Sequence, residues 1–231
     1  MRRTVIVFAI ALPIFSACSS NSSPVDLGIL KDSAPGDTFT NDLEIDGAAD
    51  VRVPDAASAT EIAYDDGTAE GNNSPWEAIP RGQLAVSFTP PFYPCVIKSA
   101  KFFVTAGGVP TTEFAVRIYA APDASTPPQS ELLAVPVKAK ANGPDEWVTV
   151  DLRGSNITVT QGDFVVAMEW LTAAGVSGQS AQFLGSDESS PDTRSWWLFA
   201  AGGNWTPIKN VGSGTGDHDR DLLIRATVRS E

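Results

Sequence analysis

The sequence predicts an all-β protein built as an antiparallel β-sandwich. Three observations favour this fold. Apolar residues alternate with other residues in five separate runs of about six to eight residues, which is the pattern of a strand with one buried face. Clusters rich in Gly, Pro, Asn and Asp separate these runs. No segment combines a helical apolar period with capping residues, and many short strands between turns indicate a sandwich.

The alternation assigns one face of each run to the core, in chain order. The side chains expected to share that face are Leu84, Val86 and Phe88; Ala100, Phe102 and Val104; Phe114, Val116 and Ile118; Phe164, Val166, Met168 and Trp170; and Leu222, Ile224, Ala226 and Val228. The opposite face should be wet, because antiparallel sheets commonly expose one side. We expect residues 61–231 to form this single domain, since about 170 residues can bury a sizeable core.

The order of these elements resembles a jelly-roll sandwich module of secreted and surface-anchored bacterial proteins. The segments that carry the resemblance are YDDGTAEG, VSFTPPFYPCVIKSAKFFV, FAVRIYA, WVTVDL, GDFVVAMEWL and DLLIRATV, which span most of residues 64–228. The resemblance implies a jelly-roll fold and an adhesive or accessory role. It supplies no catalytic residues.

Residues 1–17 have the layout of a secretory signal peptide. Two arginines precede an apolar stretch, Thr4–Phe15, which is shorter than the roughly 20 residues of a membrane span. Small residues then lead to Cys18, in an arrangement that resembles the lipobox of bacterial lipoproteins. The resemblance implies a lipid anchor, such as palmitate, on Cys18, and the serine after it points to the outer membrane, at its periplasmic face or the cell surface. The alternative is a plain secretory signal and an incidental cysteine.

Residues 18–60 are expected to form a disordered acidic tether. Between positions 19 and 60, eight carboxylates face only two cations, Lys31 and Arg52, and small polar residues fill most of the rest. Such a segment buries too little apolar surface to offset the entropy lost on ordering it. The whole chain carries a net charge of −12 and shows no basic patch with interleaved aromatics, so we expect no nucleic-acid partner.

Two acidic clusters flank the expected first and last strands. Asp65 and Asp66 lie in YDDG, and Asp217, Asp219 and Asp221 lie in GDHDRD. The first and last strands of jelly rolls are often neighbours, so the clusters are placed to meet. Calcium takes 6–8 oxygen ligands of this kind, which makes it the candidate cofactor. The alternative is that these residues only form turns, since no local calcium motif is present.

Catalytic motifs are absent from the sequence, and we expect the protein not to be an enzyme. Neither G-x-S-x-G nor H-E-x-x-H occurs, and there is no Cys/His set for zinc. His218 is the sole histidine. Cys95 is the sole cysteine besides Cys18, and we expect it to be a small buried apolar residue rather than a nucleophile.

The segment RSWWLFAAGGNWTPI is the expected ligand-binding site, with AAGGN as a hairpin loop. Trp196 and Trp197 should face opposite sides of their strand, so one of them is expected to be exposed or covered by a loop. Trp205, across the hairpin, is placed to share a face with one of them. Exposed indole rings stack on sugars or on apolar partner side chains, and Arg194 and Asn204 would add hydrogen bonds. The alternative is that all three rings pack in the interior.

Together these features favour a non-catalytic binding module on the cell envelope, with a glycan or an envelope protein as its ligand. One alternative is a ligand-free structural component of an envelope assembly, which a large apolar surface patch would indicate. A less favoured alternative is a small hydrolase, which a nucleophile in a pocket with perturbed acids would indicate.

Overall fold

The structure, a computed structural model, describes residues 58–74, 81–172, 181–189, 191–211 and 219–231. The predicted signal peptide, the lipidation site Cys18, Asp217 and all but the last residues of the predicted tether lie outside the described residues. Within them, two antiparallel sheets pack together, and the helices are two short 3₁₀ turns, η1 (Arg153–Ser155) and η2 (Ile208–Asn210). No helix in this part of the chain has the length and apolar character needed to cross a membrane. The predicted all-β antiparallel sandwich is confirmed.

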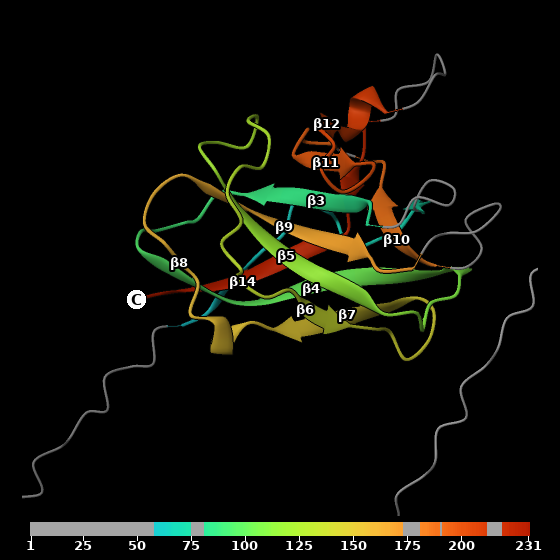
Figure 1. Ribbon diagram of the computed structural model, residues 1–231, viewed down its shortest axis with the longest axis horizontal. Helices are drawn as coiled ribbons and strands as arrows, with labels where there is room; N and C mark the ends of the chain where they lie inside the picture. Colours follow the sequence, from blue (N-terminus) through green and yellow to red (C-terminus); the bar gives the residue numbers. More distant parts are fainter. Residues whose placement is uncertain (1–57, 75–80, 173–180, 190, 212–218) are drawn as a thin grey trace, which may run out of the picture. The chain divides into compact units, whose positions relative to one another are not determined.

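The two sheets contain eight and six strands (Figure 1). The eight-stranded sheet holds β1 (Thr60–Ile62), β2 (Gly71–Asn73), β4 (Cys95–Gly108), β7 (Glu146–Asp151), β8 (Thr158–Val159), β10 (Gln182–Asp187), β13 (Asp221–Leu222) and β14 (Ile224–Ser230). The six-stranded sheet holds, in spatial order, β12 (Trp205–Pro207), β11 (Ser195–Leu198), β3 (Gln83–Phe88), β9 (Asp163–Trp170), β5 (Phe114–Ala121) and β6 (Val137–Ala139). Figure 1 shows β5 crossing in front of β14 and β4 of the other sheet.

The path of the chain is that of a jelly roll. Successive long strands alternate between the sheets, because β3, β5, β9 and β11 lie in one and β4, β7, β10 and β14 in the other. The first strand also pairs with the last, β1 with β14, from Thr60 opposite Val228 to Ile62 opposite Ala226. Hydrogen bonding therefore joins the two ends of the domain.

The core lies between the sheets and contains every side chain that alternation assigned to it. In β4 a bulge interrupts the alternation: Thr227 of β14 is opposite Ser99, but Val228 is opposite Ile97, which leaves Lys98 as an extra residue. The extra residue restores the inward direction of the side chains on both sides of the bulge. The inward side chains along all fourteen residues of β4 can therefore pack into the same core.

The prediction of a wet outer face is wrong for the six-stranded sheet. On β9 the outward-facing Val165, Ala167 and Glu169 are only 0, 0 and 2% exposed. A second apolar cluster covers this face and consists of Ala85, Tyr119, Ala121, Val165, Ala167 and Trp196, with Trp205 packed against it. We call it the outer cluster. Alternation shows that a strand has two kinds of face, but it cannot show that a distant segment covers the second one.

Candidate functional site

The predicted aromatic hairpin forms, but its two adjacent tryptophans are buried. In the pairing of β11 with β12, Trp196 lies opposite Pro207 and Leu198 lies opposite Trp205. Trp196 and Trp197 face opposite sides, as predicted, yet they are only 2% and 8% exposed. Trp197 packs into the core between the sheets. The expectation that one of the two rings is accessible to a ligand is therefore wrong.

Trp196 is buried because the outer cluster surrounds it. Its Nε1–H donates a hydrogen bond of 3.0 Å to the hydroxyl of Ser87, so the polar edge of the ring is satisfied inside the protein. Trp205 is half-buried and lies edge-on to Tyr119, with ring centroids 5.6 Å apart. The apolar ring of Trp196 is therefore buried, and its N–H group is hydrogen-bonded, without a ligand.

The two polar residues assigned to the hairpin separate in space. Asn204 is exposed in the turn before β12. Arg194 instead lies over the ring of Tyr64, with its guanidinium carbon 4.3 Å from the ring centroid. Its Nη1 donates to the hydroxyl of Thr89 at 3.0 Å and lies 3.8 Å from a carboxylate oxygen of Asp163. Arg194 therefore belongs to the surroundings of Asp163.

The two acidic clusters come together around Asp187, at the end of β10. Asp187 lies opposite Asp221 in the pairing of β10 with β13. Its Oδ2 also accepts a hydrogen bond of 2.9 Å from the backbone N–H of Asp66. One carboxylate oxygen each from Asp66, Glu70 and Asp187 lie within 4.8 Å of one another. Asp66, Glu70 and Asp187 are the acidic trio, and they are the described residues best placed to hold a cation.

The other predicted metal ligands lie elsewhere or have other partners. Asp65 accepts hydrogen bonds from Nε and Nη2 of Arg225 at 3.1 and 2.5 Å, so its charge is already compensated. Asp219 is half-buried just before β13 and does not belong to the acidic trio. Sequence reasoning missed Asp187, because it lies in GSDESSPD, which reads only as a turn. That carboxylate lies 121 residues from Asp66 in the sequence, and no motif links them.

Two neighbouring carboxylates at this end have opposite pKa shifts. Burial raises the pKa of Asp221 to about 8, and the negative charges of Asp192 and Asp187 act in the same direction. Asp187 is also buried, but the donors around it, Ser189 and the N–H of Asp66, lower the pKa of its carboxyl. The shifts favour the protonated form of Asp221 and the charged form of Asp187. Of the five predicted calcium ligands only Asp66 belongs to the acidic trio, and calcium binding stays a prediction.

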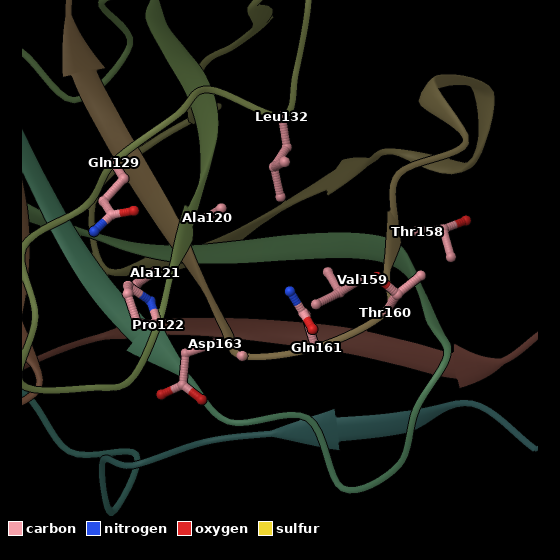
Figure 2. A pocket seen from close by; sticks show the side chains of 11 residues that line it. Ala120, Ala121, Pro122, Gln129, Leu132, Thr158, Val159, Thr160, Gln161 and Asp163 are labelled. Atoms are coloured by element: carbon pink, nitrogen blue, oxygen red, sulfur yellow. The ribbon is translucent and has the colours of Figure 1, made fainter.

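A pocket of about 520 Å³ opens at the end of the sandwich where the chain passes from β8 to β9 (Figure 2). Its size lies in the range of about 300–1,000 Å³ that is usual for small-molecule sites. It is lined by Ala120, Ala121, Pro122, Gln129, Leu132, Thr158, Val159, Thr160, Gln161, Gly162 and Asp163. Figure 2 shows Leu132 pointing toward the segment that carries Val159 and Gln161. We call it the end pocket; its residues formed no part of the predicted site.

Backbone hydrogen bonds hold one wall of the end pocket. The chain returns alongside the end of β5, where the N–H of Gln129 donates to the carbonyl of Ala120 at 2.9 Å. The N–H of Ala120 donates to the carbonyl of Ser130 at 2.8 Å, and that of Leu132 donates to Ile118 at 2.7 Å. The wall is therefore an extension of the sheet, so the pocket is preformed.

The turn at Gly162 meets the end of β5 beside this wall. Gly162 has a φ of +67°, and a Cβ there would lie 2.7 Å from the carbonyl oxygen of Ala121. Only glycine combines this backbone conformation with so close an approach. The hydroxyl of Tyr93 donates to the carbonyl of Gly162 at 2.7 Å, and the side chain remains 45% exposed beside the turn.

Asp163 is the one titratable side chain in the lining, and it is only 5% exposed. Its Oδ2 accepts a hydrogen bond of 3.0 Å from the hydroxyl of Thr89. Burial raises the pKa of Asp163, while Thr89 and the positive charge of Arg194 oppose that shift. The other polar lining residues carry neutral amide and hydroxyl groups.

A second hollow, of about 450 Å³, lies over the eight-stranded sheet, and Lys98, Arg153 and Arg229 contribute to its lining. Asp151 offsets part of this charge, because Nε and Nη2 of Arg153 donate to it at 3.0 and 2.6 Å. Both side chains are more than half exposed, and exposed ion pairs of this kind are weak. The end pocket, with its buried carboxylate, is the more developed site.

Cys95 is fully buried in the core, as predicted. Burial raises the pKa of its thiol, which keeps it protonated at neutral pH. A protonated, buried thiol is a poor nucleophile. The described residues therefore give Cys95 a packing role.

No protein-family model matches the chain, and no curated protein sequence matches it. Among solved structures, the chain is similar to the clostridial cysteine protease Cwp84 after propeptide cleavage, with a TM-score of 0.54 and 10% sequence identity. That match covers 75% of this chain and 40% of the other. A structure of the cysteine protease and lectin-like domains of Cwp84, a surface layer associated protein of Clostridium difficile, matches with a TM-score of 0.48 and 11% identity, over 66% of this chain and 32% of that one.

The chain thus spans about two fifths of the length of the first of these structures. At 10% identity, this similarity establishes a shared fold and nothing finer. The sandwich described above is therefore an architecture that also occurs within a larger protein.

Proposed function

We propose that this chain is a non-catalytic binding module of the bacterial cell envelope, held at the membrane by a lipid on Cys18. The end pocket is the observation that carries the proposal. It is preformed by backbone hydrogen bonds, it has the volume of a small-molecule site, and neutral amide and hydroxyl groups line it around one buried carboxylate. Such a lining holds a polar ligand through several hydrogen bonds.

The chemistry of the end pocket supports binding rather than turnover. A hydrolase needs a nucleophile that an adjacent base activates. The hydroxyls in the lining belong to Thr158 and Thr160, which are exposed, and Asp163 is the one titratable side chain there. The Oδ2 atom of Asp163 accepts its hydrogen bond from the hydroxyl of Thr89, not from Thr158 or Thr160.

A ligand-free structural component has less support. Among the described residues, the large apolar side chains that are exposed by more than a third are Tyr93, Val109, Val135 and Phe199. They come from four different connections between strands. No single strand or connection of the described residues gathers such side chains, as an apolar assembly surface built on one element would.

The membrane anchor is supported by the lipobox-like sequence at Cys18 and by the acidic, low-complexity segment that follows it. We propose the outer membrane as the site of the anchor. Replacing the thiol by Cys18→Ser should move the protein from the membrane fraction to the soluble fraction. Unchanged membrane fractionation of that variant would overturn the lipid anchor while leaving the binding function open to its own test.

The binding function is tested with the full chain carrying Cys18→Ser, so that the lipid does not itself cause sedimentation. We expect this protein to co-sediment with isolated envelope material. Thr160→Trp places a large ring in the lining of the end pocket and should weaken that binding by about tenfold or more, equivalent to about 1.4 kcal/mol. Thr111→Trp, at an exposed threonine in the β4–β5 connection, is the matched control and should bind like the parent. Equal binding by both variants, or no binding by the parent, would overturn the proposal.

A further inference from the structure

We infer that the end pocket takes a neutral sugar residue of an envelope saccharide, an inference that rests on the proposed function. The first argument is the hydrogen-bonding character of the lining. A sugar hydroxyl both donates and accepts, and so do a glutamine amide and a threonine hydroxyl. Gln129, Gln161, Thr158 and Thr160 all line the pocket and are exposed, and the buried Asp163 also belongs to the lining.

The charge of the lining selects against anionic ligands. None of the eleven residues that line the end pocket is a lysine, arginine or histidine, whereas Asp163 is an acid that is only 5% exposed. Arg194 lies 3.8 Å from Asp163 and also binds Thr89, but it is not part of the lining. A phosphate or uronate in the pocket would lie near this buried carboxylate, and no cation in the lining would pair with the ligand, which is costly. A neutral ligand avoids that cost.

The apolar part of the lining suits the C–H face of a sugar ring. Leu132, Pro122 and Val159 supply apolar surface beside the amides and hydroxyls. The ring of Tyr93 stands exposed beside the turn, and its hydroxyl is fixed on the carbonyl of Gly162. Aromatic rings held in this way offer a flat apolar surface with one polar end, on which a sugar can pack.

An extended peptide is a poorer occupant, because the sheet edge beside the pocket is already used. Peptides commonly bind by adding a strand to a free edge. At the end of β5 that edge is paired with the returning chain, through the hydrogen bonds between Ala120 and residues 129–130. A peptide could therefore not pair with β5 itself at this wall.

The test uses the full chain with Cys18→Ser and a panel of soluble probes: glucose, galactose, mannose, N-acetylglucosamine, glucuronate and galacturonate. Binding is measured by saturation-transfer NMR and by calorimetry. We expect at least one neutral sugar to bind and its uronate counterpart to bind at least about tenfold more weakly, since a repulsion of about 1.4 kcal/mol gives that ratio. Equal affinity for a neutral sugar and its uronate would overturn the inference.

Three variants locate the site. Gln161→Ala and Gln129→Ala each remove hydrogen bonds worth about 0.5–1.5 kcal/mol, so each should weaken sugar binding by about 2–12-fold. Asp163→Asn removes the charge and should raise uronate binding toward that of the neutral sugar. Asn204→Ala removes an exposed amide in the β11–β12 turn and is the matched control, which should bind like the parent. Unaltered sugar binding by both glutamine variants would overturn the inference.

The two proposals fail in different ways. If envelope material binds and Thr160→Trp abolishes that binding, but no neutral sugar binds or competes, the sugar inference is overturned and the proposed function stands. If neither envelope material nor any probe binds, both are overturned. The glutamines are exposed, so their alanine variants should keep the melting temperature of the parent and report on binding alone.

Discussion

The aromatic hairpin and the end pocket make opposite use of their side chains. The hairpin holds three of the chain's six tryptophans, and the two adjacent ones are 2% and 8% exposed. The end pocket has small apolar, amide and hydroxyl groups, most of them on loops, and several are exposed. Burial of large apolar rings stabilises the fold most, and the adjacent tryptophans of the hairpin are therefore buried in the interior. Polar side chains on a rigid scaffold remain available to a ligand.

Trp197→Ala gives the largest expected effect on this comparison. The ring lies in the core, so its removal should lower the free energy of unfolding by about 3–5 kcal/mol. Gln161→Ala, at the end pocket, should change the same quantity by no more than about 0.5 kcal/mol. Chemical denaturation of both variants measures the difference. If Trp197→Ala kept normal stability but lost ligand binding, the hairpin would be the binding site, and the comparison would be wrong.

Calcium binding at the acidic trio would stabilise the folded protein, as the buried hairpin does. At a calcium concentration 100-fold above the dissociation constant, binding to the native state should add about 2.7 kcal/mol to the free energy of unfolding. For a domain of this size that corresponds to roughly 5–10 °C in melting temperature. EDTA should reverse the rise.

Two variants assign the calcium effect to the trio. Glu70→Gln and Asp187→Asn should each reduce the calcium-dependent rise in melting temperature, whatever their effect without calcium. Glu113→Gln, at an exposed acid that pairs with Lys138 elsewhere, is the control and should keep the full rise. If millimolar calcium leaves the melting temperature of the parent unchanged, the two acidic clusters serve only as turns and strand ends.

Asp163→Asn gives a smaller effect, which depends on pH. Burial raises the pKa of this carboxyl in the folded protein, so the folded state holds the proton more tightly than the unfolded state. The stability that this difference contributes is fully present below about pH 4 and is lost as the pH rises through the raised pKa. The stability of Asp163→Asn relative to the parent should therefore increase between pH 4 and pH 7. A constant difference, or a decrease, would show that the pKa of Asp163 is not raised.

The inward faces of the sandwich could be predicted from the sequence because they are encoded locally. Alternation placed Leu84, Phe102 and Trp170 in the core, where each is fully buried. The burial of Glu169 could not be read in this way, because it depends on Arg117 and Arg81, which come from other strands or connections. A polar residue at an outward position of a strand can be exposed to solvent, or it can be buried and ion-paired as Glu169 is. The alternating sequence pattern is the same in both cases.

The functional regions depend even more on distant residues. The hairpin was correctly recognised as two strands, but the residues that surround Trp196 come from β3, β5, β9 and β12. The end pocket joins the end of β5 to the β8–β9 turn, and no motif marks either segment. Its one local signal is the glycine of TQGD, which indicated a turn without showing that Gly162 lines a pocket.

The most direct test of the central claim is an NMR titration of the isotope-labelled full chain, carrying Cys18→Ser, with soluble saccharide released from the envelope. We expect the largest shifts at the side-chain amides of Gln129 and Gln161 and at the backbone amide of Gly162. The indole N–H signals of Trp196 and Trp205 should remain in place. Shifts of the indole signals without any change at Gly162 would contradict the account, because they would place the ligand on the hairpin.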